Sequence, residues 1–350
     1  MQRCLELASL GLGHVAPNPM VGSVIVHNNK IIGEGYHKKY GGPHAEINAI
    51  ESVKDRSLLT ESTLYVNLEP CAHFGKTPPC SDRIVKENIP RVVIGSIDDN
   101  SLVAGKGIEK MKKAGVDVTL GILENECLNL NKRFFTYHRE KRPYIILKWA
   151  ESHDGFMDIE RNPDSSVEPY WISNQISRTI VHKLRASEQA ILVGVGTVKS
   201  DNPSLTTRDY PGKNPVRILL DPNLRLEQSY AIFNDKAQTL VFNKIKDLES
   251  NNIRFIKVDK ESDYLDGVLN NLYNLNIQSV IVEGGKLTLQ EFINMNLWDE
   301  AHVYKGQRVF IKGLVAPSMP VRPNNCLSIN NDRLYIYKNF QQKDTTRHKN

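Results

Sequence analysis

The chain has 350 residues, of which 40% are hydrophobic and 24% charged, which is typical of a globular protein large enough for two domains. The net charge is +5, and residues 1–140 hold 17 Lys and Arg against 16 Asp and Glu, which argues against a nucleic-acid substrate for that half. No apolar run reaches the ~18 residues of a membrane span, and five scattered cysteines form no disulfide framework. We therefore expect a cytoplasmic protein without membrane contact.

Helix and strand patterns alternate along the first 138 residues. An amphipathic helix is predicted at the start, at Met1–Leu7, and strands at 21–26 and 31–36 flank a hairpin turn at His27–Lys30. The elements expected after the hairpin are a helix at 44–53, a strand at 63–68, a helix from 81, a strand at 91–97, a helix at 107–114 and a strand at 116–120. This order predicts an α/β domain with three layers, α/β/α.

A basic stretch at 130–143 interrupts this pattern and is interpreted as a solvated linker. The predicted organisation is a domain at 1–138, a linker at 139–143, a second α/β domain at 144–340 and a polar tail at 341–350. In the second domain we expect strands at 144–150, 190–194, 216–221, 239–243, 254–258 and 279–282, with helices at 174–184, 263–272 and 287–295. This alternation indicates a mainly parallel sheet with helices on both faces.

A catalytic zinc site is the strongest chemical signal in the chain. His44 and Glu46 stand at a predicted helix start, and Cys71 and Cys80 follow prolines after a predicted strand. One imidazole and two thiolates leave the fourth position of zinc open for a water, whose pKa the metal lowers to ~7. Glu46, two residues beyond the ligand His44, is then predicted to be the proton shuttle of a hydrolytic deamination.

Two other interpretations of these residues were weighed. A His-x-Glu sequence is commonly an ordinary helix start, and two cysteines nine positions apart are commonly buried small hydrophobes. A closed structural zinc site would need a fourth ligand, for which His73 is the obvious candidate. The combination of all elements favours the open catalytic site.

The sequence around the expected ligands resembles a known family. The segments that carry the resemblance are Pro17-Asn18-Pro19-Met20-Val21-Gly22, Gly41-Gly42-Pro43-His44-Ala45-Glu46 and 68–80, in which eight residues separate Cys71 from Cys80. They resemble the deaminase half of bifunctional riboflavin-biosynthesis deaminase–reductases, and cytidine deaminases have a shorter spacing between the cysteines. The resemblance implies a cytidine-deaminase-like fold and a phosphorylated ribosylaminopyrimidine substrate. It assigns substrate contacts to Asn18, His37, His73, Lys76, Thr77 and Asn100.

In the second domain the residues alone indicate only a weak nucleotide-site signal. Short glycine segments at 194–197 and 283–285 each follow a predicted strand, but the G-x-G-x-x-G fingerprint is absent. The segments 147–150, 152–155, 171–173, 184–186, 191–206 with Arg208, and 282–285 resemble the reductase half of the same family, so the resemblance spans nearly the whole chain.

That resemblance implies a dihydrofolate-reductase-like fold and NADPH as cofactor, in addition to zinc in the first half. It places NADPH near Trp171, Thr197, Asp201 and Gly285. It places the reductase substrate near Lys148, Ser173, Arg185, Leu205, Arg208 and Glu283, with the ribose phosphate at Ser173, Arg185, Leu205 and Arg208. Two features depart from the family pattern: His153 stands in place of the usual Leu, and the loop at 159–170 is longer than usual.

The expected function is a two-step conversion in riboflavin synthesis. Deamination of 2,5-diamino-6-(5-phosphoribosylamino)pyrimidin-4-one is expected first, and NADPH-dependent reduction of the ribosyl group to ribityl follows. One alternative is a deaminase of nucleosides or nucleic-acid bases whose second half only binds. Another is a zinc-stabilised binding module without catalysis. The sequence leaves open whether the chain forms a homo-oligomer.

Overall fold

The computed structural model describes residues 1–74, 78–99, 104–160, 170–258 and 263–340. The chain folds into two compact units, Met1–Arg142 and Pro143–Asn350. Within the described residues, every helix is too short or too polar to cross a membrane.

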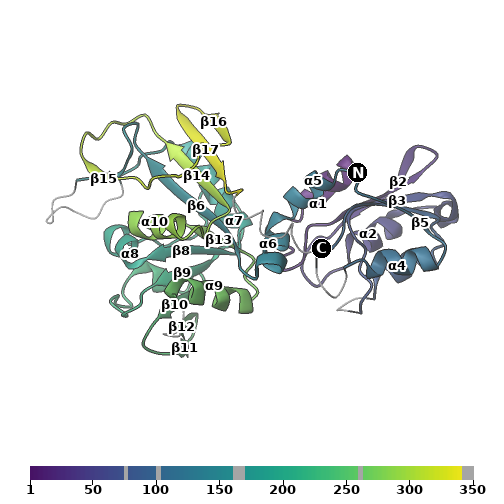
Figure 1. Cartoon of the computed structure of the whole chain (residues 1–350), viewed down its shortest axis with the longest axis horizontal. Helices are drawn as coiled ribbons and strands as arrows, with labels where there is room; N and C mark the ends of the chain where they lie inside the picture. The colour runs from purple at the N-terminus through teal and green to yellow at the C-terminus, as the bar shows by residue number, and fades with distance from the viewer. Residues whose placement is uncertain (75–77, 100–103, 161–169, 259–262, 341–350) are drawn as a thin grey trace, which may run out of the picture. The chain divides into compact units, whose positions relative to one another are not determined.

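The first unit is built on a five-stranded sheet with the order β2-β1-β3-β4-β5 (Figure 1). Strand β1 pairs antiparallel with β2 and β3, whereas β3, β4 and β5 are parallel. The strands are β1 (Gly22–His27), β2 (Lys30–Tyr36), β3 (Thr63–Leu68), β4 (Arg91–Ser96) and β5 (Asp117–Leu120). The helices are α1 (Gln2–Ser9), α2 (Ala45–Ser52), the 3₁₀ helix η1 (Arg56–Glu61), α3 (Cys80–Lys86), α4 (Lys106–Lys113), α5 (Glu124–Leu130) and α6 (Lys132–Glu140).

Helices cover both faces of this sheet, which confirms the predicted three-layer α/β/α sandwich. Because side chains alternate along a strand, Ile25 of β1 joins a core with α2, α3 and α4, while its neighbour Val24 packs with α1 on the other face. The predicted hairpin is present: Asn28 and Asn29 adopt φ values of 47° and 60°, the left-handed conformation that two-residue hairpin turns require.

The interpretation of 130–143 as a solvated linker was wrong for Lys132–Glu140, which form α6. Phe134 and Phe135 are buried in this helix and pack with Leu68 at the end of β3. Because most residues of the segment are charged or polar, its short apolar face could not be recognised from the sequence pattern. The two compact units divide between Arg142 and Pro143.

The second unit contains a ten-stranded sheet with the order β11-β12-β10-β9-β8-β13-β6-β14-β17-β16. Its strands are β6 (Tyr144–Glu151), β8 (Ala190–Gly194), β9 (Val216–Leu220), β10 (Thr239–Asn243), β11 (Leu248–Ser250), β12 (Ile253–Lys257), β13 (Ser279–Val282), β14 (Glu300–Lys305), β16 (Asn325–Ile329) and β17 (Asp332–Lys338). Strands β7 (Phe156–Ile159) and β15 (Gly313–Val315) form a separate pair. The helices are α7 (Gln175–Ser187), α8 (Val195–Asp201), the 3₁₀ helix η2 (Ala231–Phe233), α9 (Tyr264–Asn274) and α10 (Lys286–Asn294).

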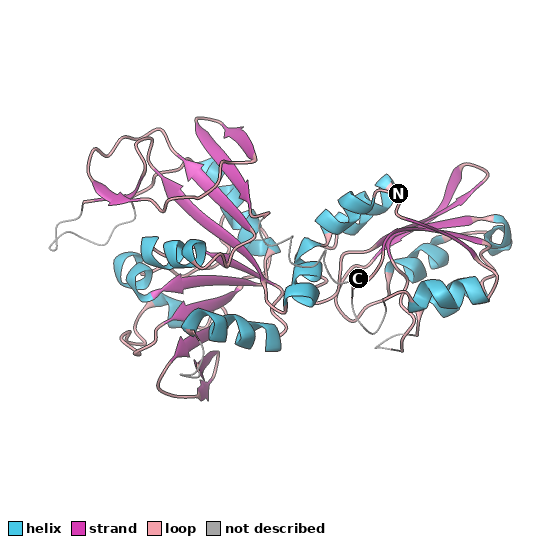
Figure 2. Cartoon of the chain, in the orientation of Figure 1, coloured by secondary structure: helices cyan, strands magenta, loops and turns pink. Residues whose placement is uncertain are grey.

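The seven neighbouring strands β12-β10-β9-β8-β13-β6-β14 pair in parallel. The pairings β11 with β12, β17 with β14 and β16 with β17 are antiparallel, so the sheet is mainly parallel as predicted. Helices flank both faces of this sheet (Figure 2). In β8, Leu192 packs with α9 and α10, whereas Ile191 and Val193 face the opposite core with α8 and η2. Open parallel sheets of this kind bind ligands beyond the carboxyl ends of their strands.

Candidate metal centre and cofactor cavity

The three predicted zinc ligands come together in the first unit. The Sγ atoms of Cys71 and Cys80 lie 3.5 and 3.3 Å from His44 Nδ1. One ligand atom from each of these residues lies within 4.8 Å of the others, and no fourth His, Cys, Asp or Glu joins the group among the described residues. One histidine nitrogen and two cysteine sulfurs are typical zinc ligands. A set of three leaves the fourth position of a tetrahedral zinc site open.

Helix starts position two of the ligands. His44 is the N-cap of α2, and Cys80 is the first residue of α3, so partial positive charge from each helix terminus faces the cluster. The approach of α2 depends on Gly35 of β2, where a Cβ atom would lie 2.3 Å from the Ala49 nitrogen. Hydrogen bonds with Cys80 and His44 lower the pKa of the Cys71 thiol, which favours a thiolate ligand.

Glu46 lies in the first turn of α2 with 3% of its surface exposed. Its Oε2 atom is buried and has no hydrogen-bond partner within the described part of the chain. Burial raises the pKa of Glu46 to about 7. A buried carboxylate oxygen without a partner is costly unless a ligand satisfies it, so this atom is available to a water or substrate at the metal.

Asn18 and His37, two predicted substrate residues, lie beside this cluster and contact each other. His37 Nδ1 donates to the Pro43 carbonyl at 3.0 Å, which leaves Nε2 as an acceptor for the Asn18 amide at 3.1 Å. Burial lowers the pKa of His37, in keeping with this neutral form. The rings of His37 and His44 meet edge to face, with centroids 5.4 Å apart.

The loop that carries Asn18 is anchored by two buried amides. Asn67 accepts from the Gly22 nitrogen at 2.7 Å and donates to the Met20 carbonyl at 3.0 Å. Asn131 makes both hydrogen bonds to the backbone of Met20, at 2.8 and 2.9 Å. Side chains far along the chain therefore hold this loop beside the metal centre.

His73 is half-buried, and its Nδ1 atom has no partner in the described structure, but it is not part of the ligand cluster. The alternative of a closed zinc site with His73 as fourth ligand is therefore not supported. The predicted substrate residues Lys76, Thr77 and Asn100 lie outside the described residues.

Glu69 has a role that the sequence did not indicate. Its buried carboxylate accepts hydrogen bonds from the backbone nitrogens of Gly105 and Gly107, both at 2.9 Å, and of Asp98 and Ile108 at 3.4 and 3.3 Å. Glu69 thus caps the start of α4 and anchors the backbone at 98 and 105. It stands two residues before the ligand Cys71 in the sequence.

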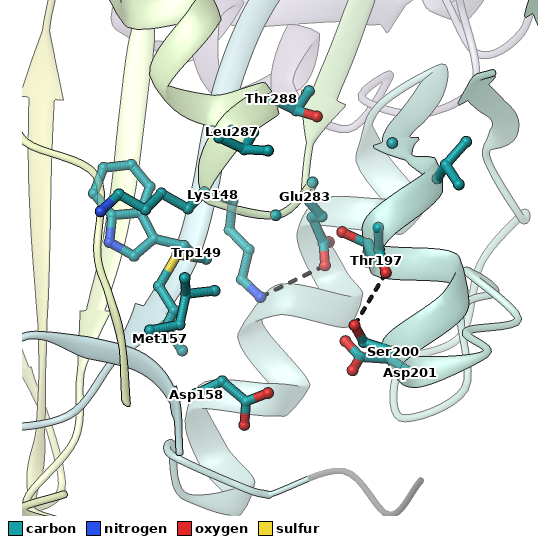
Figure 3. Close-up of a pocket in the computed structure, with 18 of the residues that line it drawn as sticks. Lys148, Trp149, Met157, Asp158, Thr197, Ser200, Asp201, Glu283, Leu287 and Thr288 are labelled. Carbon is teal, nitrogen blue, oxygen red and sulfur yellow. Dashed lines mark hydrogen bonds and ion pairs between the residues drawn. The ribbon is translucent and has the colours of Figure 1, made fainter. Parts of the chain in front are cut away.

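The second unit contains a cavity of about 970 Å³ at the carboxyl ends of its parallel strands. It is lined from neighbouring strands: by Lys148 of β6, Glu283 after β13, Gly194 of β8, Leu220 of β9 and Lys244 after β10. Figure 3 shows the Lys148 amine directed at the Glu283 carboxylate, with Thr197 and Asp201 on the other side of that carboxylate.

A buried ion cluster lies in this cavity. Arg185 of α7 binds Glu283 through two parallel hydrogen bonds of 2.9 and 2.7 Å, and Lys148 Nζ lies 3.5 Å from the same carboxylate. The remaining guanidinium nitrogen of Arg185, Nη1, donates to the Thr206 carbonyl at 3.2 Å. The local sequence showed no partner for Arg185, and the structure supplies one 98 residues away.

Burial and charge set the ionisation of this cluster. Burial by itself would raise the pKa of Glu283, but Arg185 and Lys148 outweigh it and hold this pKa at about 2. Burial lowers the pKa of Lys148, and Glu283 opposes this effect. A lysine with reduced basicity beside a fixed carboxylate suits proton transfer to a reacting group.

The cavity wall fits a dinucleotide. A Cβ atom added at Gly285, the N-cap of α10, would lie 3.3 Å from Thr197 Oγ1, so a larger residue would narrow the wall there. Thr197 Oγ1 is buried and lacks a partner within the described residues. The free backbone nitrogens at the start of α10 and this unsatisfied hydroxyl are the donor types that a pyrophosphate accepts.

Most of the reductase residues implied by the resemblance line this one cavity. They are Lys148, Trp171, Ser173, Arg185, Thr197, Asp201, Arg208, Glu283 and Gly285. Leu205 does not line it: its side chain is 4% exposed and packs in the core with Ile191 and Leu219. The backbone of Leu205, at a φ of 53°, lies in the turn that leads to Arg208.

Two further polar residues of α7 line the cavity and were missed in the sequence. Arg178 stacks on the Trp171 ring, with its guanidinium carbon 4.3 Å from the ring centroid. His182 Nδ1 accepts a hydrogen bond from the backbone nitrogen of Arg208 at 3.0 Å. Their spacing from Arg185, seven and three residues, places all three on one helix face. Helical periodicity around Arg185 was the signal that could have identified them.

The fold and the two sites define an enzyme that joins a zinc-dependent deaminase to a nucleotide-dependent reductase. Comparisons with known proteins agree with this class. Residues 1–96 match the cytidine and deoxycytidylate deaminase zinc-binding region, and residues 143–309 match the RibD C-terminal domain. The chain is similar to the riboflavin biosynthesis protein RibD of Aquifex aeolicus, with 38% identity over 97% of this chain and 98% of that protein.

A solved structure from Thermotoga maritima, a diaminohydroxyphosphoribosylaminopyrimidine deaminase/5-amino-6-(5-phosphoribosylamino)uracil reductase, is 38% identical. It superimposes with a TM-score of 0.86 and covers 97% of both chains. The RibD protein of Bacillus amyloliquefaciens is 40% identical over 91% of this chain and 86% of its own.

The chain therefore belongs to the RibD family of bifunctional riboflavin-biosynthesis proteins. It is a deaminase and reductase with Zn²⁺ and NADPH as cofactors, as the sequence predicted. The alternative of a base deaminase with a non-reductase second half is not favoured, because residues 143–309 match the reductase domain.

Proposed function

We propose that the first unit deaminates 2,5-diamino-6-(5-phosphoribosylamino)pyrimidin-4-one and that the second unit reduces the ribosyl group of the product to ribityl. The observation that carries this proposal is the three-ligand cluster of His44, Cys71 and Cys80 beside the unpartnered carboxylate oxygen of Glu46. The similar protein from Thermotoga maritima is named for this substrate class, and the cavity of the second unit supplies a site for the cofactor of the second reaction.

Zinc held by His44, Cys71 and Cys80 would acidify a water for attack on the pyrimidine. Glu46 takes the proton of the attacking water and delivers it to the departing amino group, which leaves as ammonia. Its burial beside His44 keeps bulk water from exchanging that proton. His37 holds the Asn18 amide, whose oxygen remains available to accept a hydrogen bond from the ring.

We assign the other deaminase contacts, His73, Lys76, Thr77 and Asn100, to the phosphoribosylaminopyrimidine on the resemblance alone. His73 Nδ1 supports this assignment, since a buried ring nitrogen without a partner can bind a ligand. The hydrogen bonds of Glu69 to the backbone at 98 and 105 hold the ends of the segment that contains Asn100.

In the reductase, NADPH supplies the hydride. Glu283, fixed by Arg185, keeps Lys148 charged and directed into the cavity, where its amine can donate a proton to the opened sugar. Trp171, Thr197, Asp201 and Gly285 are proposed cofactor contacts. The ribose phosphate is proposed to bind Arg208 with Ser173, the backbone at Leu205 and the remaining donors of Arg185.

A cytoplasmic location remains part of the proposal. All five cysteines are free, including Cys4 and Cys127, which are buried, and Cys326, which is exposed. Free thiols in this number are usual in a reducing compartment. Deamination is proposed to precede reduction, with no nucleic-acid partner.

One experiment tests the whole proposal. The purified chain, which we expect to hold about one zinc, is incubated with the diaminopyrimidine precursor, with and without NADPH, and the products are identified by mass. Without NADPH we expect only replacement of the amino group by oxygen from water, and with NADPH a further gain of two hydrogens. Removal of zinc with a chelator should abolish the first change, because three ligands hold the only catalytic metal proposed.

Deamination by a zinc-free preparation would contradict the metal assignment. NADPH consumption without change in the mass of the sugar would contradict the reductase assignment. The deaminated intermediate, supplied to the chelated chain with NADPH, should still be reduced, which separates the two activities.

Arg208 tests the phosphate site. Its side chain is exposed, lines the cavity and has no carboxylate partner among the described residues. A charge-assisted contact contributes ~1.5–3 kcal/mol, so Arg208→Met should raise KM for the phosphorylated intermediate by roughly 10- to 150-fold. Arg254→Met, an exposed change on β12 away from the cavity, is the matched control. Unchanged KM for Arg208→Met in steady-state kinetics would remove this residue from the phosphate site.

A further inference from the structure

A loop without regular structure carries Arg208, the residue proposed to bind the ribose phosphate. The described residues 202–215 contain no helix or strand, and the Arg208 side chain is exposed at the cavity. A side chain on such a loop binds an anion tightly only if its backbone is already held, because ordering the backbone on binding costs free energy. The hydrogen bonds of this loop therefore bear on phosphate affinity.

Helix α7 holds the loop at two points. Arg185 donates to the Thr206 carbonyl at 3.2 Å, and His182 Nδ1 accepts from the backbone nitrogen of Arg208 at 3.0 Å. The two helix residues are three positions apart, so they lie on one face of α7. The bond to His182 is the one that reaches the backbone of Arg208 itself.

The His182 ring makes this bond as a neutral imidazole. Its side chain is 6% exposed, and burial, together with the charge of Arg185, lowers the pKa of His182 to about 4. The ring is therefore neutral near pH 7, with Nδ1 as the acceptor and the hydrogen on Nε2. Nε2 lies 3.7 Å from the Asp209 carboxylate, whose charge raises this pKa by less and favours the same tautomer.

We propose that His182 is a positioning residue of the reductase: its Nδ1 fixes the backbone of Arg208 and so directs that guanidinium at the substrate phosphate. This inference rests on the proposed reductase function. A neutral ring whose Nδ1 is already engaged is poorly suited to proton transfer, so its contribution passes through Arg208.

The first test replaces the imidazole with amides of two lengths. The amide oxygen of Asn is bonded to Cγ, as Nδ1 is in His, whereas the amide of Gln lies one carbon further out, near the place of Nε2. We expect His182→Leu and His182→Gln to raise KM for the deaminated, phosphorylated intermediate by about 10-fold. The kcat should change by less than about twofold, because the phosphate is bound equally in the ground and transition states. His182→Asn should bring KM back to within about threefold of the unaltered chain, since it returns the acceptor.

A double-mutant cycle separates positioning of Arg208 from general support of the fold. We expect His182→Leu to lower kcat/KM by about 10-fold in the unaltered chain but by less than about twofold when Arg208 is already Met. Kd for NADPH, from titration calorimetry, should stay within about twofold in each variant, which also shows that the second unit is folded. Lys183→Met is the matched control, because Lys183 is the exposed neighbour on α7 and does not line the cavity.

Equal losses from His182→Leu with and without the Arg208 side chain would overturn the inference, as would an unchanged KM in His182→Leu. A His182→Gln variant with a lower KM than His182→Asn would also overturn it, since that order indicates a contact made through Nε2. Where loss of NADPH binding shows that His182→Leu does not fold, the order of the Asn and Gln variants decides. Failure of the unaltered chain to reduce the intermediate with NADPH would instead contradict the proposed reductase function.

Discussion

Glu46→Gln should abolish most deamination while the zinc stays bound. The amide is nearly the same size as the carboxylate and lies in the same buried position, but it cannot accept a proton at neutral pH. Loss of a general acid–base group lowers rates by 10²–10⁴, so we expect kcat to fall at least ~100-fold. Steady-state assays of ammonia release and elemental analysis of zinc are the two measurements.

Glu51→Gln is the control for this substitution. Glu51 lies on the same helix, α2, but its side chain is half exposed and pairs with Arg83 at 2.6 Å, away from the metal ligands. Its variant should deaminate normally, and both variants should reduce the deaminated intermediate at the original rate. Full deamination by Glu46→Gln would remove Glu46 from the mechanism, and loss of zinc from that variant would show that the residue supports the metal site.

The zinc ligands could be predicted because their signal is local. His44 and Glu46 are two residues apart, and each cysteine follows a proline at the end of a predicted strand or the start of a helix. Strand β3 and helix α2 were also predicted within one residue at both ends, and the start of α3 within one residue, because apolar periodicity is strong there. Residue type, spacing and element boundary all pointed to one site.

The ion cluster of the reductase could not be predicted in the same way. Arg185 and Glu283 are 98 positions apart, and their contact depends on α7 lying at the end of β13. A sequence pattern predicts that strands exist but not which strands are neighbours, so Arg185 looked like an unpaired cation.

Long-range hydrogen bonds account for the other roles that the sequence did not show. Glu69 was part of a recognised motif, yet its partners at Gly105 and Gly107 lie more than 30 residues away. The helix α6 was missed for a different reason, because its charged residues outnumber the apolar residues that pack with Leu68.

Glu283→Gln should destabilise the second unit more than any other single change considered. The substitution removes the only carboxylate within ion-pair distance of Arg185 and Lys148 among the described residues, and both side chains are at least 85% buried. Removing one partner of a buried pair costs about 3–5 kcal/mol, because the remaining charge is left unpaired. All three tryptophans, Trp149, Trp171 and Trp298, lie in this unit, so their fluorescence during urea unfolding reports its stability separately.

The pH dependence of this effect has a definite sign. The pKa of Glu283 is about 2 in the folded chain against an ordinary 4.5, so its contribution to stability is fully present above about pH 4.5 and is lost as the pH falls towards 2. The unaltered chain should therefore lose stability through this range, while Glu283→Gln loses less and the two curves converge. Glu249→Gln, an exposed change on β11, should follow the unaltered chain at every pH. A constant difference between Glu283→Gln and the unaltered chain from pH 6 to about 3 would mean that packing, and not the charge of Glu283, stabilises this cluster.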